Sequence, residues 1–385
     1  MLTKISIYRY QITFFLVVIL FSLAIIFMYY YCFAKQRILR PNFISIGRIH
    51  NLKNGKWVKS FFANSGVIYL NKQYISKDFG NSFYKDNNNK FEEITKDAAG
   101  AILSNTNLFY AISSEAIIEK PGIYHIKIWR SDDNLRTILQ EYATFYIPDG
   151  PKRKRHDDEF YGIGVYRSII ELPDNSWIMT MYGNFAQDEL IPQDNDAKLE
   201  TKFMMRTFIV KSTDQGRTWH YLSSVAIPRL GEPIGEGFVE PTMILLDDGR
   251  LLCIMRTGHH FPLYSSWSSD NGATWTSPVY TGFDRGIAPC LINLHNGRVA
   301  LSWGRRYAEG WSQITSEGDQ FHFKYPGKGY TCIALSDDGG QSWYNQIILR
   351  NSGSCYSTIF EVQPNVIFLQ VDGWNCRISI EANSR

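Results

Sequence analysis

Cysteine is scarce in this chain of 385 residues, and the few cysteines follow no ligand pattern. The six cysteines include no CxxC pair, and no histidine stands at zinc-ligand spacing from them. Structural zinc sites need such spacings, so the sequence predicts neither a metal nor another cofactor. One cysteine, Cys32, lies in an apolar N-terminal segment. The other five are an odd number, which disulfide pairing alone does not exhaust.

An excess of charge of one sign is also absent. Forty Lys and Arg stand against 37 Asp and Glu, which leaves a formal net charge of +3. A dedicated nucleic-acid-binding protein carries a much larger basic excess, so no nucleic-acid partner is expected. Hydrophobic residues make up 44% of the chain and charged residues 20%, which excludes a disordered or collagen-like protein. Aromatic residues reach 15%, and this favours strands over helices.

Only one long hydrophobic run occurs. From Ile12 to Phe33 the chain is apolar except for Thr13 and Ser22. At about 1.5 Å per residue, a helix of this length spans a bilayer core of about 30 Å. No small-residue cleavage site follows the run. The sequence therefore predicts an uncleaved transmembrane helix, and with it the membrane as a partner.

This anchor divides the chain into four parts. They are a tail at 1–11, the anchor at 12–34, a linker at 35–45 and a folded domain at 46–385. Lys and Arg flank both ends of the anchor, so the charge bias does not decide the orientation. The short leading tail favours a single-pass protein whose folded domain lies on the extracytoplasmic side.

A short frame, SxDxGxxW, recurs along the folded domain. Ser and Asp side chains accept backbone N–H bonds in a tight turn, Gly supplies a positive φ, and the aromatic ring packs beneath the turn. The frame therefore predicts a turn between two strands. Copies begin at Ser212, Ser268 and Ser336, a fourth copy at Ser76 ends in Phe83 instead of Trp, and Ser131–Leu135 is a decayed fifth copy.

A second repeat consists of an apolar strand, a polar turn and another apolar strand. Its copies begin at Tyr166, Glu240, Ala288 and Tyr356. Two hairpins per unit make a four-stranded antiparallel blade, and several blades around an axis make a β-propeller. With two further units upstream of residue 160, the repeats predict an all-β, six-bladed propeller of four-stranded blades.

Two details of this propeller are open to test. The last unit is one strand short, so residues near 41–47 are expected to complete it and close the ring. The basic run Lys152–Arg155, followed by acidic residues, is interpreted as a solvated loop between blades.

The SxDxGxxW frame is the Asp-box, or BNR repeat, and the chain resembles the sialidase superfamily of six-bladed propellers. The resemblance is specific from about residue 160 to 371 and weak over 46–159. It rests on four motifs beside their expected strands: Gly237–Pro241, Met255–Thr257, Ser302–Arg305 and Cys355–Ser357.

In a propeller, the first strand of each blade lines the axis, where its leading residue is near a ligand. Here the first strands lead with Arg167, Glu240 and Tyr356, and the second strands of two blades end in Arg256 and Arg305. Arginine forks bind carboxylates bidentately. This set suits an anionic sugar, with an acidic glycan or glycoconjugate as the partner.

The resemblance implies roles for these residues. Tyr356 is the nucleophile and Glu240 its base, because sialidases use a tyrosine nucleophile. Arg256 and Arg305 match the second and third arginines of the family. The first arginine is assigned to Arg167, and the acid to Asp188. The alternatives are Arg48 for the first arginine, Arg306 for the third, and Asp194 or Asp196 for the acid.

The implied function is a retaining exo-α-sialidase-like glycoside hydrolase. Two other functions stay open. One is a non-catalytic propeller that binds glycans or proteins, because the acid and the first arginine fit the family pattern least well. The other is a glycosidase or lyase that acts on uronic acids, whose carboxylate the same arginines would bind.

Overall fold

The computed structural model describes residues of one of two compact units. The units are Met1–Asn42 and Phe43–Arg385, and all described residues lie in the second. The described residues are 46–51, 56–63, 67–70, 74–85, 91, 94, 97–133, 135–150, 152–155, 158–161, 163–188, 205–229, 237–257, 262–284, 286–305, 330–350, 356–371 and 374–380. The predicted anchor at 12–34 lies outside them. No helix in the described ranges is long and apolar enough to cross a membrane.

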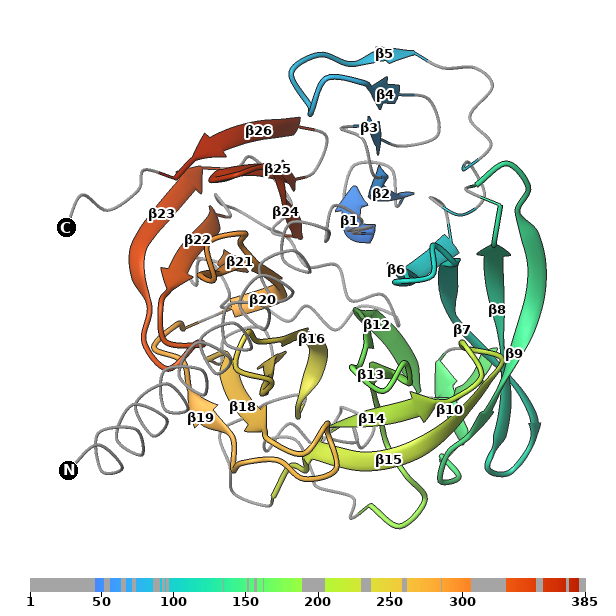
Figure 1. Ribbon diagram of the computed structural model, residues 1–385. Helices are drawn as coiled ribbons and strands as arrows, with labels where there is room; N and C mark the ends of the chain where they lie inside the picture. Colours follow the sequence, from blue (N-terminus) through green and yellow to red (C-terminus); the bar gives the residue numbers. More distant parts are fainter. Residues whose placement is uncertain are drawn as a thin grey trace, which may run out of the picture. The chain divides into compact units, whose positions relative to one another are not determined.

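The described strands form blades in chain order (Figure 1). Blade 1 has five strands: β1 (Ile46–Asn51), β2 (Lys56–Ala63), β3 (Val67–Leu70), β4 (Tyr74–Ser76) and β5 (Tyr84–Lys85). Blade 2 has β6 (Ala98–Leu103), β7 (Phe109–Lys120), β8 (Ile123–Ser131) and β9 (Leu139–Tyr146). Blade 3 has β12 (Gly164–Glu171), β13 (Trp177–Gly183), β14 (Arg206–Ser212) and β15 (Thr218–Ala226).

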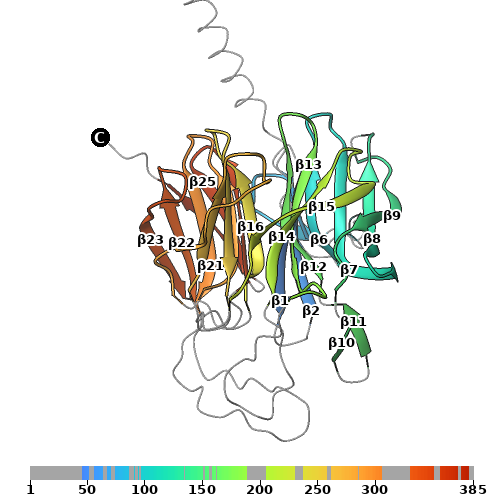
Figure 2. The same cartoon turned by 90° about the horizontal axis from the view of Figure 1, so that it is seen from below.

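The remaining blades continue this order. Blade 4 has β16 (Val239–Leu245), β17 (Leu251–Arg256), β18 (Tyr264–Ser268) and β19 (Val279–Tyr280). Blade 5 has β20 (Gly286–Asn293), β21 (Val299–Arg305), β22 (Tyr330–Ser336) and β23 (Tyr344–Arg350). Blade 6 has β24 (Ser357–Gln363), β25 (Val366–Val371) and β26 (Trp374–Ser379). A separate hairpin, β10 (Lys152–Arg155) and β11 (Asp158–Tyr161), stands apart from the blades (Figure 2).

The first strands of the blades contact one another in a closed ring. Each strand contacts the next in the order β1, β6, β12, β16, β20 and β24, and β24 contacts β1. Blades 2 and 3 are joined further, because β12 pairs with β6 and β15 pairs with β9, both in parallel. These two blades thereby form one closed set of eight strands. The described strands therefore have an all-β, propeller-like arrangement.

The hydrophobic core lies between neighbouring blades. In β13, Trp177 and Met179 pack among blade 2 residues, whereas Ile178 packs among residues of blade 4. Each blade is thus covered on both faces. Because successive side chains of a strand point to opposite faces, its strands carry apolar side chains on both faces. Between the last and first blades, Phe360 and Phe368 pack with Ile68. A fully buried Phe contributes about 1.5–3 kcal/mol, so this cluster helps to close the ring.

All five Asp-box turns have the same hydrogen bonds. The Ser Oγ accepts the N–H of the residue four positions later at 2.8–3.0 Å. The Asp carboxylate accepts the N–H of the frame's seventh residue at 2.8–3.0 Å. The decayed copy keeps both bonds, and its Leu135 takes the positive φ of 63° that glycine takes elsewhere. The frame therefore works through Ser and Asp even where Gly and Trp are replaced.

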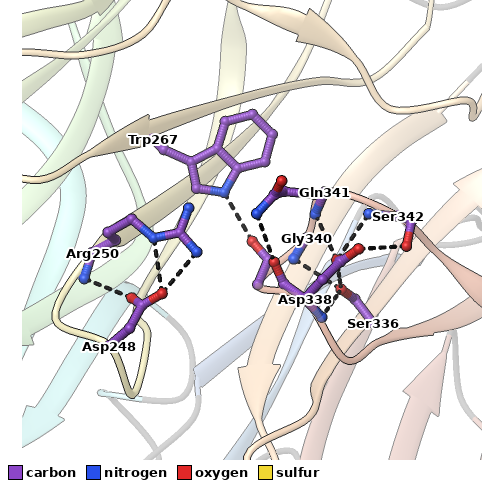
Figure 3. A network of polar contacts seen from close by, with 9 residues as sticks. Asp248, Arg250, Trp267, Ser336, Asp338, Gly340, Gln341 and Ser342 are labelled. Carbon is purple, nitrogen blue, oxygen red and sulfur yellow. Dashed lines mark hydrogen bonds and ion pairs between the residues drawn. The ribbon is translucent and has the colours of Figure 1, made fainter.

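These turns also join neighbouring blades (Figure 3). In blade 4, the indole N–H of Trp267 donates to the carbonyl of Gly339 in the blade 5 Asp-box, at 2.8 Å. The same arrangement links the blade 2 residue Tyr110 to Gly216 in the blade 3 box, at 3.0 Å. The Asp-box carbonyls thus bind the preceding blade.

Three expectations need correction. Blades 1 and 6 have five and three described strands instead of four. Of the residues near 41–47 that were expected to complete the last blade, Ile46 and Gly47 pair with β2 in blade 1 instead, and 41–45 lie outside the described residues. The basic run Lys152–Arg155 is a strand instead of a loop, and it pairs with Asp158–Tyr161. Pairing places Lys154 opposite Glu159 and Arg155 opposite Asp158 in the register of this hairpin.

Candidate functional site

Three first strands share an unusual backbone feature where the candidate site residues lie. Arg167, Glu240 and Ala288 have φ values of 59°, 46° and 47°, in the left-handed region. Each lies where the pairing of its strand is interrupted, in β12, β16 and β20. Such conformations cost about 1–3 kcal/mol each, and bulges of this kind redirect a side chain. The repetition in three successive blades marks these positions as functional candidates.

Glu240 is the centre of the site. Its Oε1 accepts a hydrogen bond from the Tyr356 hydroxyl at 2.9 Å and lies 2.7 Å from Nη1 of Arg256. Its Oε2 accepts the backbone N–H of Ala288 at 3.0 Å. Residues of blades 4 and 5, and Tyr356 directly before the first strand of blade 6, therefore meet at one carboxylate. Glu240 is 8% exposed, so these partners replace the water that it loses.

The charge state of Glu240 follows from these partners. Burial by itself raises the pKa of Glu240, but the charge and hydrogen bond of Arg256 outweigh it, with help from Tyr356 and the Ala288 amide. The pKa of Glu240 therefore lies below its ordinary value. An ionised carboxylate in contact with a phenol is able to accept the phenolic proton.

Arg167 lies across the ring from Tyr356. Its Nη1 donates to the Thr358 Oγ1 at 3.3 Å, and its guanidinium lies over the Tyr166 ring, 5.0 Å from the centroid. Arg167 is 8% exposed, and its Nε and Nη2 have no hydrogen-bond partner among the described residues. Glu240 is near enough to act on it electrostatically. The two unpartnered nitrogens are suited to an anionic ligand.

Asp188 does not join this group through any contact in the described part of the chain. Both of its oxygens bind Arg206, one to Nε at 3.0 Å and the other to Nη2, and Oδ2 also accepts the N–H of Phe185 at 2.7 Å. Arg206 is largely buried at the start of β14 and also bonds Ser224. An acid catalyst must reach the leaving oxygen, whereas both Asp188 oxygens are directed at Arg206. The geometry gives Asp188 a role in fixing the segment after β13.

The third predicted arginine is placed by its backbone. Arg305 is the last residue of β21, where it pairs with Gly286 and Tyr330. In this register Gly304 corresponds to Arg256, because both pair with the residue before a left-handed position. Arg305 therefore lies one residue beyond the position that Arg256 occupies. Among the alternatives, Arg48 lies in β1, and Asp194, Asp196 and Arg306 lie outside the described residues.

In the described part of the chain, no group of three His, Cys, Asp or Glu side chains is arranged to hold a metal ion. Four of the cysteines lie there as free thiols: Cys253, Cys290, Cys332 and Cys376.

Comparison with protein families supports the repeat assignment. The model of the BNR repeat-like domain matches residues 108–367, well over half of the chain. The chain belongs to the BNR repeat-like domain family. This membership confirms the Asp-box prediction. Comparison with curated protein sequences gives no match.

Solved structures show what the BNR repeat-like chain resembles in fold. A protein of unknown function from Dyadobacter fermentans is 15% identical with a TM-score of 0.52, over 86% of this chain and 93% of that one. A Hadza microbial sialidase is 15% identical, with a TM-score of 0.48 over 84% of this chain and 62% of that one. A Penicillium chrysogenum alpha-L-arabinanase, complexed with arabinobiose, is 12% identical with a TM-score of 0.47, over 85% and 88%. At such identities the likeness extends to the fold alone.

Two members of the site escape sequence analysis. Thr358 binds Arg167 from the opposite side of the ring, and the amide of Ala288 binds Glu240. Neither contact follows from a motif, because each joins residues that are far apart in the chain. The available signal for Thr358 is its spacing, two residues after Tyr356 on the same strand.

Proposed function

We propose that this BNR repeat-like protein is a glycoside hydrolase that removes a terminal acidic sugar, with sialic acid favoured. The observation that carries the proposal is the hydrogen bond of 2.9 Å between the Tyr356 hydroxyl and the ionised, buried Glu240. A phenol is a weak nucleophile unless a neighbouring base takes its proton. A tyrosine next to a carboxylate is the pair that such a reaction needs.

The charges around the pair favour an anionic sugar. Arg256 contacts Glu240 directly, and Arg167 has two nitrogens without a partner among the described residues. A carboxylate nucleophile would be repelled by an anionic substrate, whereas a neutral phenol is not. Arg167 and Arg256, with Arg305 as the third arginine, would bind the sugar carboxylate.

The reaction then has two steps. The Tyr356 oxygen forms a bond to the anomeric carbon, its proton passes to Glu240, and the bond to the leaving oxygen breaks. Water next attacks the anomeric carbon and gives a proton to the residue that had protonated the leaving oxygen, while the tyrosyl–sugar bond breaks and the proton on Glu240 returns to Tyr356. Two inversions give net retention at the anomeric carbon. Asp188, Asp194 and Asp196 are candidates for the acid that protonates the leaving oxygen.

The test uses the full-length protein in detergent and a fluorogenic α-sialoside. Tyr356→Phe removes the nucleophile and is expected to lower kcat by about 100-fold or more. The matched control is Tyr280→Phe in β19, whose hydroxyl also donates to a carboxylate, that of Asp284, at 3.0 Å. The control should turn over within about twofold of wild type. Full activity of Tyr356→Phe would refute the assigned nucleophile.

The pairing of Asp188 with Arg206 favours a second candidate, a propeller that binds acidic glycans without cleaving them. If Asp188 only fixes the loop after β13, and Asp194→Asn and Asp196→Asn leave turnover unchanged, the reaction lacks its acid. A folded wild type that binds sialosides and leaves sialosides and uronides intact would establish this candidate. Cleavage of uronides alone would indicate the uronic-acid reading of the same site.

We further propose that residues 12–34 anchor the protein in a membrane as a single pass, with the propeller on the extracytoplasmic side. The apolar composition of the segment supports the anchor. An acidic glycan of the cell surface or its surroundings would be accessible from that side.

A further inference from the structure

Arg167 connects opposite sides of the ring of first strands. In the order of contacts, β12 is the third strand and β24 the sixth. The hydrogen bond from Arg167 Nη1 to Thr358 Oγ1, at 3.3 Å, therefore spans the ring. Arg167 is 8% exposed and Thr358 is fully buried, so water competes little for this bond. The left-handed conformation of Arg167 places its side chain in this unusual position.

Thr358 is two residues from the proposed nucleophile. Tyr356 directly precedes β24, whose pairing with β25 begins at Ser357 and Val371. Alternate residues of an extended chain point to the same side, so Tyr356 and Thr358 share a direction. The bond to Thr358 therefore acts on the side of the strand that presents Tyr356 to Glu240.

We propose that the Arg167–Thr358 hydrogen bond holds Tyr356 within reach of Glu240, which makes Thr358 a positioning residue. Arg167 then has two roles. Its Nη1 binds Thr358 in blade 6, while its Nε and Nη2 are left to bind the ligand. The effect on catalysis rests on the proposed glycosidase function. The effect on the position of Tyr356 does not, and it is measurable without turnover.

The decisive variant is Thr358→Val, which removes the acceptor and keeps the shape of the side chain. A small displacement of a reacting group lowers kcat more than substrate binding. We expect kcat to fall about tenfold, because Tyr356 moves relative to Glu240, while KM stays within about twofold, because the variant removes neither of the arginines that would bind the substrate. Thr358→Ser keeps the hydroxyl and should restore most of kcat. The matched control is Thr331→Val in β22, a buried threonine whose hydroxyl has no partner among the described residues. It should leave both constants unchanged.

A second readout is independent of activity. With 3-fluorotyrosine at position 356, the ¹⁹F shift and its pH titration report the contact of the phenol with Glu240. Thr358→Val should change both, whereas Thr358→Ser and Thr331→Val should match the wild type. An unchanged ¹⁹F signal in Thr358→Val overturns the proposal, and so does a change in KM alone. If Thr358→Val does not fold, the Ser variant is compared with wild type by ¹⁹F, and the proposal then requires the same signal from both. If the wild type cleaves no glycoside but the ¹⁹F signal still changes in Thr358→Val, the proposed function is rejected and the positioning role of Thr358 is kept.

Discussion

At the residue scale, the acidity of Glu240 is set by its partner Arg256. Burial raises the pKa of Glu240, and the charge of Arg256 at 2.7 Å is the largest influence that lowers it. A base must be ionised, so activity falls as the pH drops through this pKa. Arg256→Gln should therefore move the acid limb of kcat upward by about one pH unit or more. The kcat–pH profile of the two proteins measures the shift.

A matched control for this prediction lies in the same blade. Arg250 binds Asp248 in an exposed turn, with Nη2 at 2.7 Å from Oδ2. Arg250→Gln removes the same charge away from Glu240 and should leave the acid limb in place. If Arg256→Gln has the profile of the wild type, Glu240 is not the group that limits activity in acid.

The residues of the site differ in how far the sequence reveals them. Glu240, Arg256 and Tyr356 were placed by short motifs, and the structure brings these three together. Asp188 was chosen by its place after a strand, but its partner Arg206 is 18 residues away and belongs to the next strand. The sequence does not show which charges will meet across a turn, so it does not reveal the ion pair between Asp188 and Arg206.

At the element scale, the Asp-box succeeded because its hydrogen bonds are local. Ser131 and Asp133 make the expected bonds in the decayed copy, although Leu135 replaces glycine. The bulges at Arg167 and Glu240 could not be predicted, because a bulge depends on the partner strand. The strand at Lys152–Arg155 was missed for the same reason, because it depends on pairing with the strand Asp158–Tyr161.

Two glycines, one in the blade 3 Asp-box turn and one in the turn between β16 and β17, differ in what they contact, and this yields a prediction about stability. Both Gly216 and Gly249 have positive φ values, 83° and 86°. A Cβ on Gly216 would lie 2.5 Å from the Tyr110 ring of the preceding blade, whereas one on Gly249 meets nothing within 4 Å. Gly249→Ala should cost about 1–2 kcal/mol through backbone strain alone. Gly216→Ala should cost about 1–3 kcal/mol more through overpacking.

Denaturant unfolding of the two variants and the wild type measures the difference in the free energy of unfolding. Equal losses for Gly216→Ala and Gly249→Ala would mean that the Asp-box turn does not pack tightly against the preceding blade.

At the scale of the whole molecule, repeats predicted the kind of fold but not how its ends meet. The repeat units gave the number of blades, because each unit contributes one first strand to the ring. The closure was wrong in detail, since blade 6 has three described strands and contacts blade 1 through Phe360, Phe368 and Ile68. Within the described part of the chain, these two blades are joined by side-chain packing and not by a shared strand. Such packing joins residues almost 300 positions apart, which a local pattern does not show.

The membrane anchor is the last prediction at this scale. Wild-type protein expressed in cells should sediment with membranes and resist extraction at alkaline pH. Val17→Arg with Leu20→Arg places two charges in the middle of the apolar run. Each costs about 2.5–3.5 kcal/mol at the centre of a membrane helix, so this double variant should leave the membrane fraction.

The control for this experiment introduces two arginines outside the apolar run. Ile5→Arg with Ile7→Arg lies in the predicted tail and should stay with the membrane. Protease added to intact cells should cleave the propeller if it faces outward, because a single pass exposes the whole folded domain on one side. Release of the wild type by alkaline extraction would refute the anchor. Protection of the propeller in intact cells would keep the anchor and reverse its orientation, and would separate the proposed enzyme from glycans outside the cell.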